Sequence, residues 1–336
     1  MKPRNCLRLV PFAGLCGLML GLLGGCTPEG TEGPHLDPAR ALPAGVAEAG
    51  WPRTFADDLG VEITLDKPPE RVVSIPPGVT EVIFALGEGD RLVGISDFCD
   101  YPPEVAEKES VGNISEPSVE KIISLQPDLV FAVRGVKAEV IESLRGAGIN
   151  VMGENPESLG EVIELVREVG RCLGADAQAA ELATEMTARR DRVQERTQER
   201  LTSAKRVRVL FTIGIEPLFV AGPASFVHDL IDLAGGANVV GEGGEEINRP
   251  WPQYSVEKVI EHDPDAIIAA TGEHTEEGGD LLERLRDKTG WRDLSAVRDG
   301  RVYEVDPDLL LRVGPRLLDG LEALEKIMRD QGEEGE

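Results

Sequence analysis

The sequence contains few aromatic residues and few cysteines. Aromatic side chains make up 4% of its 336 residues, and only 5 residues are cysteine. Beyond residue 26 only Cys99 and Cys172 remain. Two cysteines in a chain of this length do not build a disulfide framework, and their spacing does not require them to pair. The composition therefore excludes a small domain held together by disulfides.

Positive charge is also scarce. Lysine and arginine together number 35, against 61 aspartates and glutamates, and the formal net charge is −26. A protein that binds nucleic acid needs a basic face to neutralise phosphates. We therefore expect no nucleic-acid partner.

The motifs of common enzyme classes are missing as well. The sequence has no Gly-x-Ser-x-Gly elbow, no P-loop and no Gly-x-Gly-x-x-Gly segment after a predicted strand. Its four histidines, His35, His228, His262 and His274, lack the spacing of a metal site. His274 follows a predicted strand and is a weak candidate for ligand contact. These absences favour a non-enzymatic protein with no cofactor and no resident metal.

One long hydrophobic run is present, at the N-terminus. Basic residues precede an apolar stretch that ends in Leu23-Gly24-Gly25-Cys26, a pattern typical of a signal peptide and similar to a bacterial lipobox. We predict a signal peptide over residues 1–26 with lipidation at Cys26; the alternative is an ordinary signal peptide with a chance cysteine. Residues 27–53 read as a flexible tether. The expected location is the periplasmic or cell-surface face of a bacterial membrane.

The rest of the sequence alternates strands and helices. Apolar runs predict strands, and amphipathic segments between them predict helices, which together indicate parallel sheets covered on both faces. The predicted strands lie at residues 71–75, 91–96, 128–133, 149–152, 206–214, 266–270 and 301–305. The predicted helices lie at residues 80–86, 118–125, 137–146, 158–173, 225–234, 255–262, 279–288 and 315–329.

A repeated phrase divides this pattern in two. "SVEKIISLQPDLVFA" begins at Ser118, and "SVEKVIEHDPDAIIAA" begins 137 residues later at Ser255. Between the copies, about 25 residues free of glycine and proline predict one helix roughly 37 Å long, capped by Asp176. The predicted domains are an N-terminal α/β lobe at 54–175, an interlobe helix at 176–204, a C-terminal α/β lobe at 205–331 and an acidic tail at 332–336.

Ligands of open parallel sheets bind beyond the carboxyl ends of the strands, so two such lobes predict a cleft lined by the loops that follow strands. These loops are residues 76–80, 97–103, 133–135, 214–219, 249–254 and 306–316. They carry Phe98, Tyr101, Trp251 and Tyr254, which suit a large flat ligand; the alternative is that Tyr101 and Trp251 plug the lobe interface. Arg134 and Arg312, also in these loops, are suited to amides or anions of the ligand, or else to pairing with surface acids.

The chain resembles the helical-backbone, or class III, periplasmic substrate-binding proteins of ABC uptake systems. The resemblance runs from Thr54 to the last helix through "DDLGVEITLDKPPERVVSIPPGVTEVIFALG", "DFCDYPPEV", "PSVEKIISLQPDLV", "WPQYSVEKVIEHDPDAII" and "WRDLSAVRDGRVYEVD". It implies a monomer without catalytic activity and with little lobe closure. The predicted ligand contacts are Pro77, Phe98, Tyr101, Arg134, Phe219, Trp251 and Arg312.

Within that family, "CDYPPE", "PDLVFAVRG" and "RPWPQYSVE" are most similar to the members that bind cobalamin. The resemblance therefore implies cobalamin or a related corrinoid as the transported metal chelate. At Ile114, Val133 and Leu309 a cobalamin binder carries tryptophan, which leaves a ferric siderophore or haem as an alternative ligand. A tethered ligand sensor without a transporter is the alternative from another class.

The repeated phrase also carries a glutamate in each copy, Glu120 and Glu257. The resemblance implies that these two residues dock the protein on a permease homodimer that works with ATPase subunits. One acid on each lobe suits a partner with one site in each of two identical subunits. The alternative is that each is a first-turn acid, favoured by the helix N-terminus and selected for folding alone.

Overall fold

The computed structural model describes residues 50–242, 247, 249–271 and 281–333. The predicted signal peptide with Cys26, most of the predicted tether, and His274 lie outside these residues. Within the described ranges, no helix combines the length and the hydropathy that a membrane span requires.

The N-terminal lobe is built on a four-stranded parallel sheet in the order β4-β3-β5-β6. Its strands are β3 (Val72–Ser74), β4 (Leu92–Ile95), β5 (Leu129–Val133) and β6 (Asn150–Glu154). An antiparallel hairpin of β1 (Arg53–Ala56) and β2 (Glu62–Leu65) precedes it. The helical segments of this lobe are α1 (Pro77–Ala85), η1 (Gly89–Arg91), η2 (Pro103–Glu107), α2 (Val119–Ser124), α3 (Ala138–Gly146) and α4 (Leu159–Leu173).

The C-terminal lobe contains a second, five-stranded sheet. Its strands are β7 (Val207–Ile215), β8 (Leu218–Val220), β9 (Gly236–Asn238), β10 (Ala266–Ala269) and β11 (Val302–Glu304), in the order β11-β10-β7 with β8 and β9 both beside β7. β8 departs from the expected pattern, because it folds back antiparallel on β7 where the sequence predicted a loop. The helices are α6 (Phe226–Leu233), α7 (Val256–His262), α8 (Leu281–Asp287), α9 (Ser295–Arg298), α10 (Pro307–Leu310) and α11 (Leu317–Glu333).

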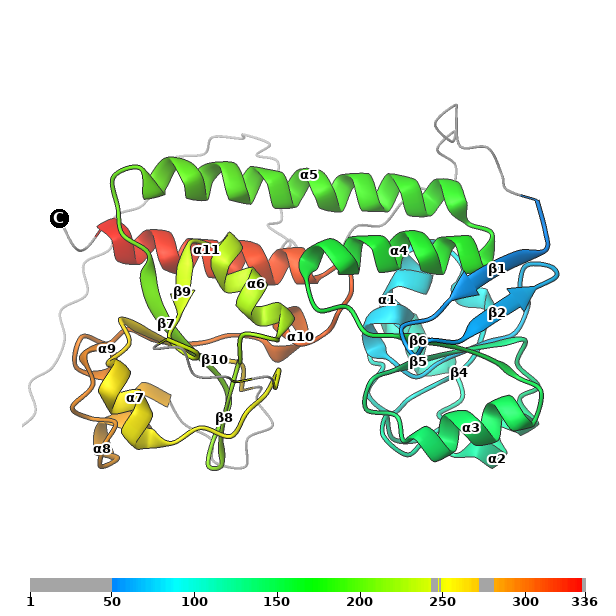
Figure 1. Ribbon diagram of the computed structural model, residues 1–336, viewed down its shortest axis with the longest axis horizontal. Helices are drawn as coiled ribbons and strands as arrows, with labels where there is room; N and C mark the ends of the chain where they lie inside the picture. Colours follow the sequence, from blue (N-terminus) through cyan, green and yellow to red (C-terminus); the bar gives the residue numbers. More distant parts are fainter. Residues whose placement is uncertain (1–49, 243–246, 248, 272–280, 334–336) are drawn as a thin grey trace, which may run out of the picture. The chain divides into compact units, whose positions relative to one another are not determined.

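One long helix, α5 (Asp176–Leu201), joins the two sheets. It packs against α4 of the first lobe and α11 of the second (Figure 1). A single apolar cluster runs beneath it, from residues such as Leu165 through Leu182 of α5 to Leu321 of α11. Asp176 begins the helix rather than capping it, and its carboxylate pairs with Arg53 at 2.8 Å. The predicted fold class, two α/β lobes joined by one long helix, is confirmed.

The repeat extends beyond the phrase visible in the sequence. Val72 pairs with Leu129 across β3 and β5, and 137 residues later Val209 pairs with Ala266 across β7 and β10. The backbone amide of Asp128 donates to the carbonyl oxygen of Arg71 at 2.8 Å, and that of Asp265 donates to Arg208 at the same distance.

The two described non-glycine residues with positive φ, Gln126 and Asp263, also occupy matching places in the two copies. The lobes therefore share one β-α-β plan at constant spacing.

Each copy of the plan covers one face of its sheet with the repeated helix. Ile122 of α2 packs in an apolar cluster with α3 on the face of the first sheet away from α4 and α5. Val259 of α7 packs with α8 and α9 in the corresponding cluster of the second sheet. The opposite faces of both sheets contribute to the shared cluster under α5. Thus α2 and α7 both lie on the side of their sheet remote from the joining helix.

A buried carboxyl group ends β6. Glu154 is 4% exposed, and its Oε1 has no hydrogen-bond partner. Burial, together with the nearby carboxylates of Glu168, Asp58 and Asp57, raises the pKa of Glu154 to about 9. The folded protein therefore holds this proton at pH values where the unfolded chain has released it.

We expect this group to make the protein less stable in mild alkali. The stability that the neutral Glu154 carboxyl allows is fully present below the ordinary glutamate pKa. It is lost as the pH rises toward the raised pKa of about 9. Glu154→Gln keeps the shape without the charge, so it should gain at least about 1 kcal/mol of unfolding free energy over the wild type between pH 5 and 9. Urea unfolding at several pH values measures this, with the exposed Glu142→Gln as control. Parallel pH profiles for Glu154→Gln and the wild type would contradict the expectation.

Candidate functional site

At the carboxyl end of β3, a short turn leads into α1. Pro77 is at the first helical position, where its missing N–H costs nothing. The Thr80 hydroxyl donates to Ser74 Oγ at 2.8 Å, and Cys99 Sγ lies 3.2 Å from the Thr80 hydroxyl. Burial raises the pKa of the Cys99 thiol. Cys99 and Cys172 are both free and buried, so they do not pair.

The N-terminus of α1 meets the segment that precedes α11. A side chain at Gly78 would collide with the backbone of Val313, so the two chains approach as closely as glycine permits. Glu81, one turn further along α1, is buried and accepts two hydrogen bonds from Arg316, at 2.6 and 3.0 Å. Burial raises the pKa of the Glu81 carboxyl although Arg316 and Arg312 oppose the shift. This contact links residues of the two lobes.

Arg312, predicted to contact ligand, lies in the same charged cluster. Its guanidinium pairs with Asp100 through two contacts, the longer one 2.8 Å, and with Asp308 at 2.7 Å. Its side chain is 13% exposed. Burial by itself lowers the pKa of Arg312, but the hydrogen bonds that it donates to Asp100 and the charges of Asp308, Asp100 and Glu81 raise it overall. The arrangement fits the alternative in which Arg312 pairs with acids; its contact with ligand stays a prediction.

Two predicted aromatic contacts lie beside this cluster. The Arg316 guanidinium carbon is 4.1 Å from the centre of the Tyr101 ring, a cation–π contact. Phe98 is 50% exposed, an unusual amount for so large an apolar side chain. Pro77, Tyr101 and Arg312 are therefore brought to one place, and the exposed Phe98 belongs to the same loop as Tyr101.

The other predicted contacts gather elsewhere. The Trp251 ring is half-buried and lies 6.4 Å, centre to centre, from Phe211 and from Phe226. Phe219 forms a backbone bridge with Gln253, two residues beyond Trp251, so these two aromatic residues share one corner of the C-terminal lobe. Tyr254, expected on a cleft loop, is instead buried.

The Tyr254 hydroxyl lies 2.8 Å from His262 Nε2, in the apolar cluster on the face of the second sheet remote from α5. On the N-terminal lobe, Arg134 is exposed and pairs with Glu157 at 3.2 Å. The predicted contacts thus form three groups in the structure, one at the lobe junction, one in the C-terminal lobe and Arg134 by itself.

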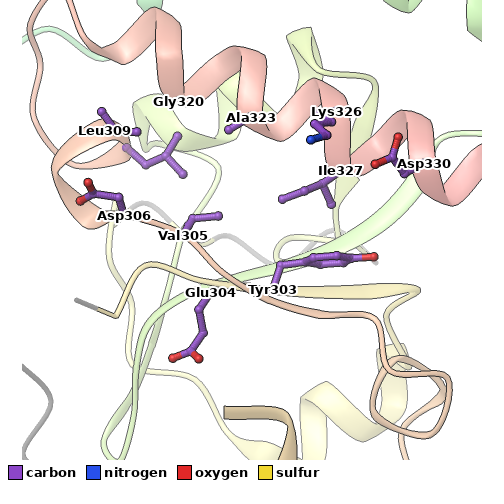
Figure 2. Close-up of a pocket in the computed structure, with 11 residues that line it drawn as sticks. Tyr303, Glu304, Val305, Asp306, Leu309, Gly320, Ala323, Lys326, Ile327 and Asp330 are labelled. Atoms are coloured by element: carbon purple, nitrogen blue, oxygen red, sulfur yellow. The ribbon is translucent and has the colours of Figure 1, made fainter. Parts of the chain in front are cut away.

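A cavity of about 430 Å³ lies within the C-terminal lobe, between α11 and the chain that leaves β11 (Figure 2). Tyr303 and Leu309 line it from one side, and Ala323 and Ile327 of α11 line it from the other. Part of the loop at 306–316, predicted to line the cleft, therefore faces α11. None of the predicted ligand contacts lines this cavity.

The two glutamates of the repeated phrase have matching surroundings. Ser118 Oγ accepts a hydrogen bond from the Lys121 amide at 3.3 Å, and Ser255 Oγ accepts one from the Lys258 amide at the same distance, so each serine caps its helix. Glu120 and Glu257 follow in the first turn, and both are exposed. Within the described residues, neither carboxylate has a hydrogen bond or an ion pair.

Sequence reasoning missed the charged contact between the lobes. Glu81 is the only acid in the otherwise apolar or small segment "PGVTEVIFA", and an acid at a core-facing position indicates a buried partner. The sequence therefore indicates that Glu81 has a buried partner, but it does not identify which residue that partner is. Arg316 lies 235 positions away in the sequence, and only the fold brings the two together.

Known proteins resemble this chain over most of its length. The periplasmic binding protein family model matches residues 72–309. An uncharacterized ABC transporter substrate-binding lipoprotein of Bacillus subtilis, YvrC, is 32% identical over 279 residues, 82% of this chain and 84% of that protein. The vitamin B12-binding protein of Vibrio cholerae is 30% identical over 258 residues, 76% of this chain and 87% of that protein.

Solved structures agree in fold. The periplasmic vitamin B12-binding protein BtuF of Vibrio cholerae superposes with a TM-score of 0.68 at 26% identity, over 79% of this chain and 98% of that chain. A periplasmic haem-binding protein of Pseudomonas aeruginosa superposes with a TM-score of 0.69 at 27% identity, over 77% of this chain and 92% of that chain. The family model spans well over half of the sequence and the arrangement of two lobes around one helix is shared. The chain belongs to the periplasmic binding protein family.

Proposed function

We propose that this protein captures cobalamin or a related corrinoid outside the cytoplasm and delivers it to an ABC permease. The observation that carries the proposal is the similarity to a vitamin B12-binding protein over most of both chains. A lipid anchor at Cys26 would hold the protein at the membrane, and the partner is a permease homodimer with its ATPase subunits. The protein itself supplies binding and no catalysis.

The arrangement of the aromatic residues supports a large flat ligand. Phe98 exposes half of its surface beside Tyr101, and Trp251 with Phe219 offers a second aromatic surface on the other lobe. Large rings held at the carboxyl ends of strands can cover the faces of a macrocycle. The shared apolar cluster under α5 keeps the two lobes from separating widely, so we infer capture with little closure.

Haem is the second candidate, and one observation favours it. The haem-binding protein of Pseudomonas aeruginosa matches this fold as well as the B12-binding protein does. Ile114, Val133 and Leu309 also stand where a cobalamin binder carries tryptophan, so three rings that could cover a corrin are replaced by smaller side chains.

A titration of residues 27–336 with cobalamin, haem and a ferric siderophore tests the proposal. Tryptophan fluorescence reports binding, because a coloured ligand close to Trp251 quenches its emission. We expect saturable binding of cobalamin at micromolar concentration or below. If only haem or only the siderophore binds, that compound replaces cobalamin as the proposed ligand. If none of the three binds, the proposed role in their transport is wrong.

Trp251 should contribute directly to that affinity. Trp251→Ala removes a half-buried ring and should weaken ligand binding by about 1–3 kcal/mol, the usual loss for an aromatic anchor. Trp51→Ala, on the other lobe, where the ring lies under the Arg53 guanidinium, is the matched control and should leave the affinity unchanged. Because Trp251 also packs on Phe211, the thermal stability of each variant is measured in parallel. Unchanged affinity in Trp251→Ala would remove this residue from the site.

A further inference from the structure

The repeated helices expose an apolar residue as well as an acid. Ile123 of α2 is 42% exposed, and Ile260 of α7 is 48% exposed. Across the described part of the chain, only Leu59 and Phe98 join them as large apolar side chains with comparable exposure. Two of the four therefore occupy the same place in the two copies of the repeat, 137 residues apart.

In each copy, the isoleucine lies beside the glutamate. Glu120 and Ile123 are three positions apart on α2, and Glu257 and Ile260 have the same spacing on α7. Residues at this spacing share one side of a helix. Each lobe thus exposes one surface made of a carboxylate and a branched apolar side chain, here called the Glu–Ile pair.

These isoleucines lie at the margin of the buried surface of each helix. Ile122 and Val259, the preceding residues, are fully buried and anchor their helices to the sheet. The following residues, Ser124 and Glu261, are polar and exposed. Ile123 and Ile260 therefore leave nearly half of their apolar surface in water, at positions where a polar residue would be ordinary.

The neighbouring lysines do not neutralise the glutamates. Lys121 donates through Nζ to the carbonyl oxygen of Ser110 at 3.2 Å, and Lys258 Nζ lies 5.5 Å from the centre of the Tyr254 ring. Both ammonium groups therefore engage their own lobe. Each Glu–Ile pair keeps its negative charge beside an apolar contact surface.

We infer that each Glu–Ile pair is one docking point, received by a permease site that combines a cation with an apolar recess. This inference rests on the proposed transport function and adds the isoleucines to the docking surface. Removal of the isoleucine from water supplies affinity, while the carboxylate sets orientation against the cation. Two equal pairs, on the sides of the two sheets remote from α5, suit a partner that offers the same site twice.

Binding of the protein to the permease–ATPase complex of the same organism, held in lipid nanodiscs, tests the inference. Ile123→Ser and Ile260→Ser should each weaken binding about tenfold, and the double variant about a hundredfold, because the two sites lie on separate lobes. Leu59→Ser, an apolar residue of similar exposure outside the repeat, should bind like the wild type. Ligand affinity should stay unchanged in all of them.

The outcomes separate this inference from the function on which it rests. If Glu120→Arg and Glu257→Arg lose binding while both serine variants bind like Leu59→Ser, docking stands and the role of the isoleucines is wrong. If neither the arginine nor the serine variants lose binding, the docking surface lies elsewhere. If the wild-type protein binds ligand but does not bind the complex, the proposal that it delivers ligand to this permease is wrong.

Discussion

Reversal of the charge at Glu120 or Glu257 is expected to abolish transport while leaving ligand binding intact. Both carboxylates are exposed, and within the described ranges both lack a partner of their own. An arginine at either place would face the cation that we propose in the permease, and like charges at an interface cost several kcal/mol. We therefore expect uptake in proteoliposomes to fall at least about tenfold for each single variant.

The competing explanation is that the two glutamates serve their helices alone. A first-turn acid contributes about 0.3–1 kcal/mol through the helix N-terminus, so its reversal would lower stability slightly wherever it stands. Glu139 in the first turn of α3 and Glu283 in the first turn of α8 are exposed or partly exposed acids of the same kind, one on each lobe. Glu139→Arg and Glu283→Arg are therefore matched controls.

The measurement compares the four variants. Loss of uptake in Glu120→Arg and Glu257→Arg, with normal uptake in the two controls, supports docking. Equal uptake in all four would mean that the repeated acid serves folding only. A ligand titration of each variant separates failure to dock from failure to bind.

The two-lobe fold was predictable because its signals are local and occur twice. The phrase that begins at Ser118 returns at Ser255 with its capping serine, its buried residue and its Pro-Asp turn intact. Helices and strands between these points follow from hydrophobic spacing. The constant spacing of the pairing partners, as between Val72 and Val209, shows that the repeat describes a whole β-α-β unit.

The site was only partly predictable, because its decisive contacts are distant in sequence. Loops after strands were identified from the order of elements, but the direction of each side chain was not. Arg312 was expected either to contact ligand or to pair with acids, and the structure surrounds it with three carboxylates, two of them from the other lobe. Its contact with ligand stays a prediction. Tyr254 was expected at the cleft, but its amide donates to the carbonyl oxygen of Leu218 in β8 and its ring packs beside His262 in the apolar cluster remote from α5.

The exposed isoleucines were missed for a different reason. In the sequence, Ile122-Ile123 and Val259-Ile260 read as the apolar side of a helix, and both members of each doublet appear suited to the core. Only the burial of the first member and the exposure of the second distinguish them. A hydrophobic pattern predicts which side of a helix is covered, but not which residue at its margin stays exposed.

The second large effect is expected at Glu81. Its side chain is 3% exposed and holds Arg316 through two hydrogen bonds. Removal of one partner from a buried ion pair leaves the other charge without compensation, which costs about 3–5 kcal/mol. Glu81→Ala should therefore lose about that much unfolding free energy, because Arg316 stays buried beside Arg312.

Equilibrium unfolding in urea measures the loss, and an exposed pair supplies the control. Lys67 and Glu70 lie 2.7 Å apart with side chains 66% and 75% exposed, and such pairs contribute about 0–1 kcal/mol. Glu70→Ala should therefore change stability little. In a double-mutant cycle, Arg316→Ala should cost much less once Glu81 is already alanine, because no charge is then left unpaired.

The result also bears on how the lobes are held. Beyond the helix α5 and its apolar cluster, the Glu81–Arg316 contact joins α1 to the segment before α11, beside the close approach of Gly78 and Val313. If Glu81→Ala loses less than about 1 kcal/mol and shows no coupling to Arg316→Ala, water reaches this contact and it does not hold the lobes. If the coupling is large, charge as well as apolar packing holds α1 of the first lobe against the segment before α11 of the second.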